Sequence, residues 1–497
     1  MKHALSLFLL AGLGAAFAPL TPALESSAPA AEQAVEAVLA NAPLERALAT
    51  VDEENLRADI YFLASDDLGG RDTVSIGQRI AARFIRARMQ RLGLAPGTGD
   101  SYFYEYTLLN KRLDKDTLTT SISKGDAEHG LTYGEDYRLS GWTPFAADVN
   151  AEVVYVGDGE IEGEQYEGRW ALIDSADGRT WNLRRQVRDS GVVGVLVAPT
   201  DGVDLLEVAG DADSRMFTGR ISYPGGTSNN TPTPTLLLSA DAAAKLKEGA
   251  EAGKVVDASF AHSQALTSDS EIRAENVTAL WPGSDPELRN EVIIISAHYD
   301  HVGVSGDDIY NGADDNGSGT ATLMALAEAL TEYGPMRRSV MFIWVSGEEK
   351  GLLGARAWAE NPVLPEGMRP VMNLNMDMVG RKADNELYVT PSSQHEGYNG
   401  LTRLAETFAP LEGFGDFPEG REQGFEGLGS ADVYYRRSDH AEFAKLEIPV
   451  CFLFAGEHED YHKPTDTAEK INYGKVKRVT RLVLRMLDAL QADELDL

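Results

Sequence analysis

Five groups of polar residues stand out in the sequence. Four of them directly follow, or lie shortly after, an apolar run that is predicted to be a buried strand. The groups are His298-Tyr299-Asp300-His301, the loop 311–319 (NGADDNGSG), Glu348-Glu349, Asp377, and the trio His458, Tyr461 and His462. Parallel strands end at one edge of a sheet, which is where ligand sites form. Buried carboxylates are costly unless they are paired or bind a metal. Two imidazoles with three carboxylates suit zinc, so the sequence predicts a metal centre at this edge.

Each group by itself also has a purely structural interpretation. A histidine after a strand is typical of a hydrogen-bonded loop, and Asp, Asn and Gly favour turns and helix caps. Adjacent glutamates such as Glu348 and Glu349 are typical of a solvated surface. These interpretations do not explain why all the groups fall at one edge of the predicted sheet, and this coincidence favours the metal centre.

The pair Glu348-Glu349 indicates what such a centre could do. Neighbouring side chains point in different directions, so one glutamate can ligate a metal while the other accepts a proton from a water molecule. A polarising ion beside a carboxylate base is the arrangement that a metal hydrolase needs.

The elements that would position these residues alternate between strands and helices. Apolar runs predict strands at 276–281, 291–297, 339–345, 372–376, 386–389 and 449–454, and amphipathic runs predict helices at 319–333, 352–359, 401–409 and 476–492. Continuously apolar strands that alternate with helices predict an α/β fold with a mixed, mostly parallel central sheet flanked by helices.

The N-terminal half has a different pattern. Residues 55–94 are predicted to be helical, with a break at the glycines of LASDDLGGR (63–71) and with Ile80, Phe84 and Ile85 at core spacing. A strand is expected at 102–109. Between residues 130 and 266, short β-rich runs (152–156, 170–174, 192–197 and 235–239) and a helix at 181–190 predict a small α+β insert.

Six motifs together resemble those of the co-catalytic zinc aminopeptidases, the M28-type peptidases of clan MH. The motifs are AHYDHVG, NGADDNGSG, SGEEKGLLGA, NMDMVGR, RRSDHAEFA and DYHKPTDT. The same clan also contains glutamate carboxypeptidase and the transferrin receptor. The insert resembles a protease-associated (PA) domain through the segments 168–174 and 190–197. The resemblance implies a zinc exopeptidase fold divided into a signal peptide (1–23), a linker with a helix (24–54), peptidase segments at 55–129 and 267–497, and the PA-like insert at 130–266.

The resemblance also implies roles for individual residues and two zinc ions per chain. Asp315 would bridge the ions through a loop with a cis Asp315–Asn316 peptide, His298 and Asp377 would hold one ion, and Glu349 and His462 the other. Glu348 would be the general base, and the Asp300 carboxylate would orient His298. Asp439 and His440 lie in a family motif without an assigned role. From the residues alone, Asp314 competes with Asp315, and His458 with His462.

The implied activity is hydrolysis of N-terminal residues from peptides that have a free N-terminus. A carboxypeptidase of the same fold would need an arginine for the substrate carboxylate, and Arg381, Arg436 and Arg437 are candidates. A glutaminyl-cyclase-type acyltransferase would use one zinc ion. A receptor that has lost catalysis would have substituted ligands, whereas this chain has the full set.

Composition limits the partners and the cellular location. The 497 residues carry 45 Lys and Arg against 78 Asp and Glu, a net charge of −33, which disfavours nucleic acid and anionic membranes as partners. Lys2 followed by the apolar run 4–17 predicts a signal peptide, hence export to the periplasm or beyond with no membrane span after cleavage. Cys451 is the one cysteine, so a disulfide within the chain is excluded, and its place in PVCFLFA predicts a buried thiol.

Overall fold

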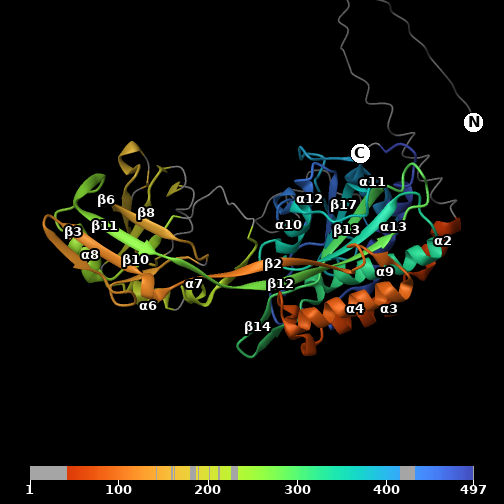
Figure 1. Cartoon of the computed structure of the whole chain (residues 1–497), viewed down its shortest axis with the longest axis horizontal. Coiled ribbons are helices and arrows are strands. Elements are labelled where there is room, and N and C mark those ends of the chain that lie inside the picture. Colours follow the sequence, from red (N-terminus) through yellow and green to blue (C-terminus); the bar gives the residue numbers. More distant parts are fainter. Residues whose placement is uncertain are drawn as a thin grey trace, which may run out of the picture.

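Two β-sheets organise the chain, and each forms the centre of one lobe (Figure 1). The computed structural model describes residues 42–495 except for 142, 158–159, 162, 179–185, 188–189, 201, 211–212, 225–232 and 415–430. The signal peptide expected at 1–23 and most of the helix expected at 181–190 therefore lie outside the described residues. Within them, no helix is both long enough and apolar enough to cross a membrane.

The nine-stranded sheet of the first lobe is mixed, which confirms the expected α/β class. Four parallel strands form its centre: β19 (Val450–Phe454), β17 (Arg369–Asp377), β13 (Glu291–His298) and β16 (Ser339–Val345). Antiparallel strands flank them: β18 (Tyr388–Thr390) on one side, and β12 (Leu266–Trp281), β2 (Phe103–Leu113), β9 (Arg220–Ser222) and the short β1 (Ala95–Pro96) on the other. Parallel pairing is confined to the four central strands, which carry the longest apolar runs.

Strand β13 shows why these runs form the centre. Successive side chains of a strand point to opposite faces, so a strand that is covered on both faces must be apolar throughout. Ile293 and Ile295 belong to one hydrophobic cluster, whereas Val292 and Ile294 belong to a cluster on the other face. Both faces of the sheet are therefore cores.

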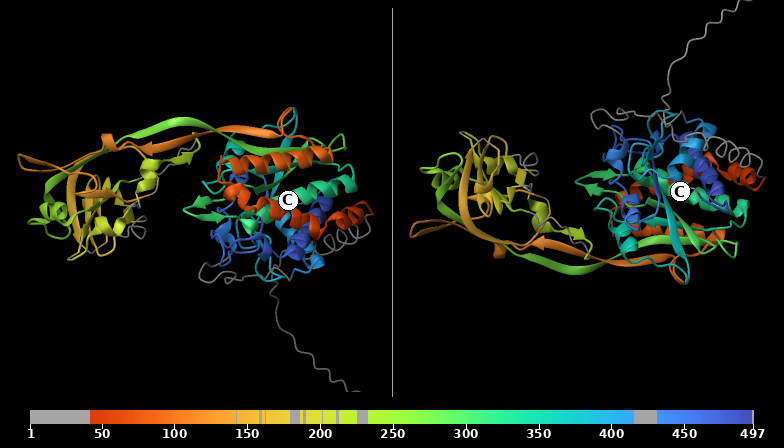
Figure 2. Two further views of the ribbon diagram at one scale, coloured as in Figure 1. Left: turned by 90° about the horizontal axis from the view of Figure 1, so that it is seen from below. Right: turned by 90° about the horizontal axis from the view of Figure 1, so that it is seen from above.

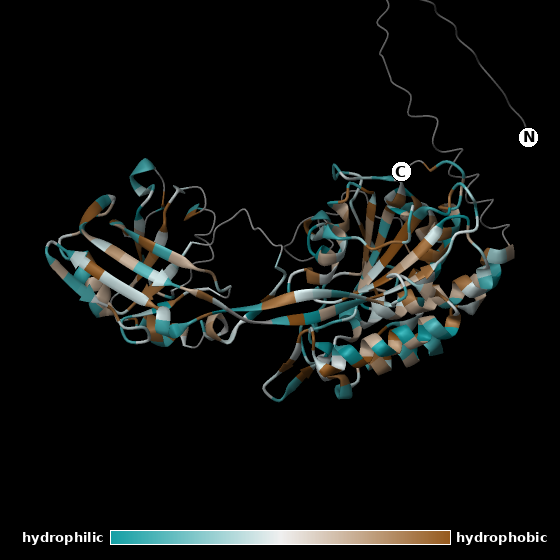
Figure 3. Ribbon diagram, in the orientation of Figure 1, coloured by the Kyte–Doolittle hydropathy of each residue, from teal (hydrophilic) through white to brown (hydrophobic). Residues whose placement is uncertain are grey.

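Helices cover both faces of this sheet. The larger cluster contains side chains from α2 (Ala42–Thr50), α3 (Glu53–Leu63), α4 (Ile76–Leu92), α9 (Gly319–Tyr333), α11 (Gly400–Phe408) and α13 (Tyr473–Ala489). The opposite cluster is closed by α10 (Leu353–Glu360) and α12 (His440–Ala444). Figure 3 shows hydrophobic central strands and a hydrophilic outer surface on α3 and α4. On α4, Ile85 is buried and Phe84 stacks on Phe62, but Ile80 is 44% exposed, so its expected place in the core was wrong.

The second lobe contains an eight-stranded sheet with a parallel centre and antiparallel edges. Its strands are β3 (Thr119–Lys124), β4 (Ala127–Gly130), β5 (Tyr137–Leu139), β6 (Ala147–Gly157), β7 (Trp170–Ser175), β8 (Gly194–Pro199), β10 (Thr235–Leu238) and β11 (Lys254–Gln264). Helices α6 (Leu205–Ala209), α7 (Ser214–Thr218) and α8 (Ala240–Lys247) accompany them. Strand β3 precedes residue 130, the expected start of the insert, and pairs with β11.

The two lobes are joined by one long antiparallel pair, β2 and β12 (Figure 2). The pairing runs from Leu113 opposite Leu266 to Phe103 opposite Val277, so the chain leaves the first sheet along β2 and returns along β12, and in between β9 also pairs with β2. The second lobe is thus inserted between two neighbouring strands of the first sheet.

The two-sided core generates a stability prediction. Ile295→Ala removes a side chain that is fully buried in β13, and we expect it to lower the free energy of unfolding by about 2–5 kcal/mol. Ile80→Ala on the exposed side of α4 is the control, and its effect should stay within about 0.5 kcal/mol. Urea unfolding followed by circular dichroism measures both. Equal losses in the two variants would contradict the assignment of β13 to the core.

Candidate metal centre

The carboxyl ends of the parallel strands bring the predicted polar groups together. His298 ends β13 and lies opposite Val345, the last residue of β16. Asp377 ends β17 on the other side of β13. Glu348 and Glu349 follow β16, and His462 lies in the loop after β19. The strand ends that were inferred from apolar runs therefore meet at one edge.

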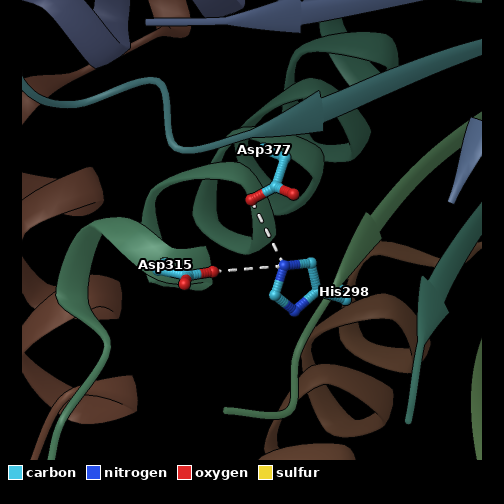
Figure 4. A group of neighbouring side chains, drawn as sticks. All are labelled: His298, Asp315 and Asp377. Atoms are coloured by element: carbon cyan, nitrogen blue, oxygen red, sulfur yellow. Dashed lines mark hydrogen bonds and ion pairs between the residues drawn. The ribbon is translucent and has the colours of Figure 1, made fainter. Parts of the chain in front are cut away.

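A first ligand group consists of His298, Asp315 and Asp377 (Figure 4). The Nε2 atom of His298 lies 3.3 Å from Oδ1 of Asp315 and 3.2 Å from Oδ1 of Asp377. All three side chains are buried. The Nδ1 atom of His298 faces the main-chain oxygen of Asp300 at 3.1 Å, so Nε2 points to the carboxylates.

A second ligand group shares Asp315 with the first. The Nε2 atom of His462 lies 3.1 Å from Oδ2 of Asp315 and 3.1 Å from Oε2 of Glu349. His301 also faces this group, with Nδ1 at 2.9 Å from Oε1 of Glu349 and 3.7 Å from Oδ2 of Asp315, and His301, Asp315 and Glu349 lie close enough to one another to hold a metal ion themselves. The sequence shows His301 within HYDH, but sequence reasoning gave it no role.

Asp315 lies between the two groups, with Oδ1 toward His298 and Oδ2 toward His462. Its loop is held from behind by Asp466, whose carboxylate accepts the main-chain N–H groups of Asp314 and Asp315. The Asp315–Asn316 peptide is cis, as the resemblance implied. Asp314 points elsewhere, to Nε2 of His458 at 3.2 Å. Thus Asp315 and His462 face the two candidate groups, whereas Asp314 and His458 face each other.

The two groups fit zinc. Ligand atoms at ~2.0–2.2 Å from a tetrahedral zinc ion are roughly 3.3–3.6 Å apart, and the closest approaches within the groups are 3.1–3.3 Å. The donors are imidazole nitrogens and carboxylate oxygens, which zinc accepts. Nε2 of His462 lies 3.1 Å from the buried Oδ2 atom of Asp315, but within the part of the chain that the structure describes no donor meets this oxygen with hydrogen-bond geometry. A cation between these groups would satisfy that oxygen.

Glu348 lies beside the first group, and Asp300 positions its backbone. Oε2 of Glu348 is 4.0 Å from Nε2 of His298. The Asp300 carboxylate accepts the main-chain N–H of Glu348 at 3.2 Å and the hydroxyl of Thr73 at 2.9 Å. Its Oδ1 is 3.8 Å from Nδ1 of His298, so the contact with the imidazole comes from the Asp300 main-chain oxygen rather than from the expected carboxylate. The difference arises because Asp300 follows the end of β13, where i and i+2 side chains no longer share a face.

The pKa values of Glu348 and His298 are both raised, but for different reasons. Burial raises the pKa of Glu348 well above its usual range, and the neighbouring Glu349 and Asp377 carboxylates add to this increase. Burial alone would lower the pKa of His298, but the carboxylates of Asp377 and Glu348 outweigh it and hold this pKa well above its usual value. The centre therefore has an excess of buried negative charge that a cation would compensate.

Arg71, from the LASDDLGGR motif, supports the ligand loops. Its buried guanidinium donates to the main-chain oxygens of Tyr299 (2.9 Å), Asn311 (2.7 Å) and Gly312 (2.9 Å), and to that of Leu63 at the end of α3. Burial lowers the pKa of Arg71 to about 10, so it stays charged at neutral pH. Sequence reasoning assigned this motif only to a helix break, because a partner more than 200 residues away leaves no local signal.

Residues of the RRSDH motif lie behind Asp377. The Ser438 hydroxyl donates to Oδ2 of Asp377 at 2.9 Å, which leaves Oδ1 to face His298. Asp439 is fully buried, and burial raises the pKa of its carboxyl well above the usual range. His440 stacks on Phe452 with ring centroids 4.4 Å apart, and burial lowers its pKa to about 3.

A pocket opens beside the two ligand groups. Asp315, Glu348, Asp377 and His462 form its polar side. The remaining lining residues are mainly aromatic or apolar: Met378, Tyr434, Phe452, Phe454 and Tyr461, together with the ion pair of Arg437 and Glu457 at 2.9 Å. The pocket can therefore hold an apolar side chain of a ligand against its aromatic wall and a polar group of the same ligand beside the carboxylates.

Comparisons with known proteins agree with this geometry. Residues 276–487 match the model of peptidase family M28. Leucine aminopeptidase 2 of Trichophyton rubrum is 30% identical over 229 residues, 42% of this chain and 43% of that protein. Leupeptin-inactivating enzyme 1 of Streptomyces exfoliatus is 32% identical over 219 residues, 44% of each chain. The chain thus spans less than half the length of these relatives.

A solved structure extends the likeness to the whole fold. An aminopeptidase from Aneurinibacillus sp. strain AM-1 superposes with a TM-score of 0.53 at 22% identity, covering 89% of this chain and 95% of that one. A coverage of 89% cannot leave out the whole second lobe, so the likeness of fold is not confined to the first lobe.

The contacts of Arg71 generate a prediction about the centre. Arg71→Met should remove the donors of four main-chain oxygens, so we expect it to lower the free energy of unfolding by about 3 kcal/mol or more. Arg91→Met in the last turn of α4 is the control and should leave stability nearly unchanged. Urea unfolding measures both. A stable Arg71→Met variant would show that the ligand loops do not depend on this guanidinium.

Proposed function

Because residues 276–487 belong to peptidase family M28, we propose that the protein is a zinc-dependent aminopeptidase that removes N-terminal residues from peptides at a two-metal site. The observation that carries the proposal is the position of Asp315, whose two carboxylate oxygens face two different ligand groups. A carboxylate in this position can bridge two ions. His298 and Asp377 would complete one metal position, and Glu349 and His462 the other.

Zinc ions bound at these positions would supply Lewis acidity, polarising the substrate carbonyl and easing the deprotonation of water. Glu348 would accept the proton of the attacking water and transfer it to the leaving amine. The raised pKa of its carboxyl favours this role, because a general base works best when its pKa is near the operating pH. Asp300 would keep Glu348 in place through its main-chain N–H.

The charges around the pocket favour an amine over a carboxylate as the substrate terminus. Arg381 is bonded to Asp460 at 2.8 Å, and Arg437 to Glu457 at 2.9 Å, so two of the three arginines that a carboxypeptidase could use are already paired. Glu348 and Asp377 line the pocket, and their carboxylates would attract a protonated amine. The aromatic wall would then receive the side chain of the N-terminal residue.

We also propose where the enzyme acts and what kind of domain its second lobe is. The predicted signal peptide at 1–23 would export the enzyme to the periplasm or beyond. The insert would be a PA-like domain that flanks the peptidase lobe, an interpretation supported by its place between β2 and β12.

The role of Glu348 can be tested directly. Glu348→Gln keeps the size of the side chain but removes the proton acceptor, so turnover should fall by about 10²–10⁴-fold while the metal content stays at the wild-type level. Glu360→Gln, on the exposed end of α10, is the control and should keep full activity. Steady-state kinetics with metal analysis by mass spectrometry provides both readouts. A near-normal rate in Glu348→Gln would remove this residue from the mechanism.

Substrate and metal can be tested together on the wild-type protein. Aminoacyl reporter substrates with a free amine should be cleaved, their N-acetylated forms should not, and a chelator should abolish the activity until zinc is restored. Large apolar residues should be preferred because of the aromatic wall. Cleavage of the acetylated forms alone would contradict the aminopeptidase, and one zinc per chain would favour an acyltransferase of the glutaminyl-cyclase type.

A further inference from the structure

We propose that His301 is a positioning residue for the second metal position: its Nδ1–H holds Oε1 of Glu349, so that Oε2 of the same carboxylate is presented to the metal. This inference rests on the proposed function, since it concerns how one of the two metal positions is built. It adds a residue that lies outside the ligand set implied by the resemblance.

The two oxygens of Glu349 are divided between two imidazoles. Nδ1 of His301 lies 2.9 Å from Oε1, and Nε2 of His462 lies 3.1 Å from Oε2. His462 is also 3.1 Å from Oδ2 of Asp315, so it points to the space between the two carboxylates, as a ligand would. His301 is 3.7 Å from that oxygen, so its nearer contact is with Glu349.

Hydrogen-bonding capacity identifies which nitrogen of His301 carries the proton. An ionised carboxylate only accepts hydrogen bonds, so the nitrogen that faces Oε1 of Glu349 must be the donor. In a neutral imidazole the other nitrogen, Nε2, is then an unprotonated acceptor. Within the described part of the chain, buried Nε2 has no hydrogen-bond partner.

The surroundings of His301 keep its ring in this orientation. The side chain is fully buried, and its main-chain N–H donates to the main-chain oxygen of Arg71 at 3.2 Å. The ring packs against Gly312, where an added Cβ would lie 2.5 Å from Cγ of His301. Gly312 also has a φ of +56°, which favours glycine. Arg71 and Gly312 thus direct the imidazole toward Glu349.

An outer hydrogen bond of this kind affects metal binding in a recognisable way. It fixes the orientation of the ligand carboxylate, and removing such a partner typically weakens metal affinity by about 10–100-fold. Glu349 contacts only the second group, so the effect should be confined to the second metal position. Purely structural damage would instead weaken both positions.

Two variants of His301 test the proposal. His301→Ala removes the donor, whereas His301→Asn can place an amide N–H close to the position of Nδ1. The metal-free full-length protein is titrated with Zn²⁺ in the presence of a competing chelator, which yields a dissociation constant for each position. We expect His301→Ala to weaken one of the two by about 10–100-fold, and His301→Asn to restore it to within a few-fold of wild type. The Co²⁺-substituted forms should keep the wild-type absorption spectrum, because no ligand changes.

The control is His262, a buried histidine in the second lobe that contacts Thr120 and Gln264. His262→Ala should leave both dissociation constants unchanged. Two outcomes would overturn the inference: unchanged Zn²⁺ binding in His301→Ala, or loss of the second ion in both His301 variants with an altered Co²⁺ spectrum, which would make His301 a ligand. Fewer than two ions in the wild-type protein would instead refute the proposed two-metal site itself.

Discussion

The structure depends on concentrated negative charge at the carboxyl edge of the central sheet. Asp300, Asp315, Asp377 and Asp439 are buried there, and Glu348 and Glu349 beside them are partly buried. Burying carboxylates together is unfavourable unless cations or hydrogen-bond donors compensate them. Three histidines and the guanidinium of Arg71 provide part of this compensation. The remaining charge favours the proposed metal centre over a salt-bridge network, since a divalent ion would bring more positive charge into the same volume than a side chain can.

Rigidity at this edge comes from the parts of the fold that carry no charge. Parallel pairing of β13, β16 and β17 brings their ends into register, and the two cores on either side hold the strands. Hydrogen bonds to main-chain atoms then orient the ligand loops, as those of Arg71, Asp466 and Asp300 do. Like charges can remain close because the backbone that carries them is itself fixed.

Much of this arrangement could be predicted from local sequence. The bounds expected for the 319–333 helix and the 339–345 strand agree with α9 and β16, because long apolar runs report burial directly. The positions of His298 and Asp377 at strand ends followed from the same kind of run, whereas the choice of Asp315 over Asp314 rested on the family resemblance alone. Arg71, His301 and Ser438 received no role, because their effects depend on partners that are distant in the sequence or on which atom faces which. Ile80 shows that the spacing of apolar residues can also mislead, because an apolar residue at helical spacing need not face the core.

The lone cysteine and the overall charge show how global composition relates to the site. Cys451 is fully buried in β19, as its apolar run predicted, and burial strongly raises the pKa of its thiol. Six clustered acids are a small fraction of the 78 in the chain, so the site does not produce the net charge of −33. The excess is therefore mainly spread over the surface, where it would draw the cationic termini of the proposed peptide substrates toward the protein over a distance of about one Debye length. Long-range attraction and local recognition would then favour the same end of the proposed substrate, because the pocket beside the candidate metal groups is also lined by carboxylates.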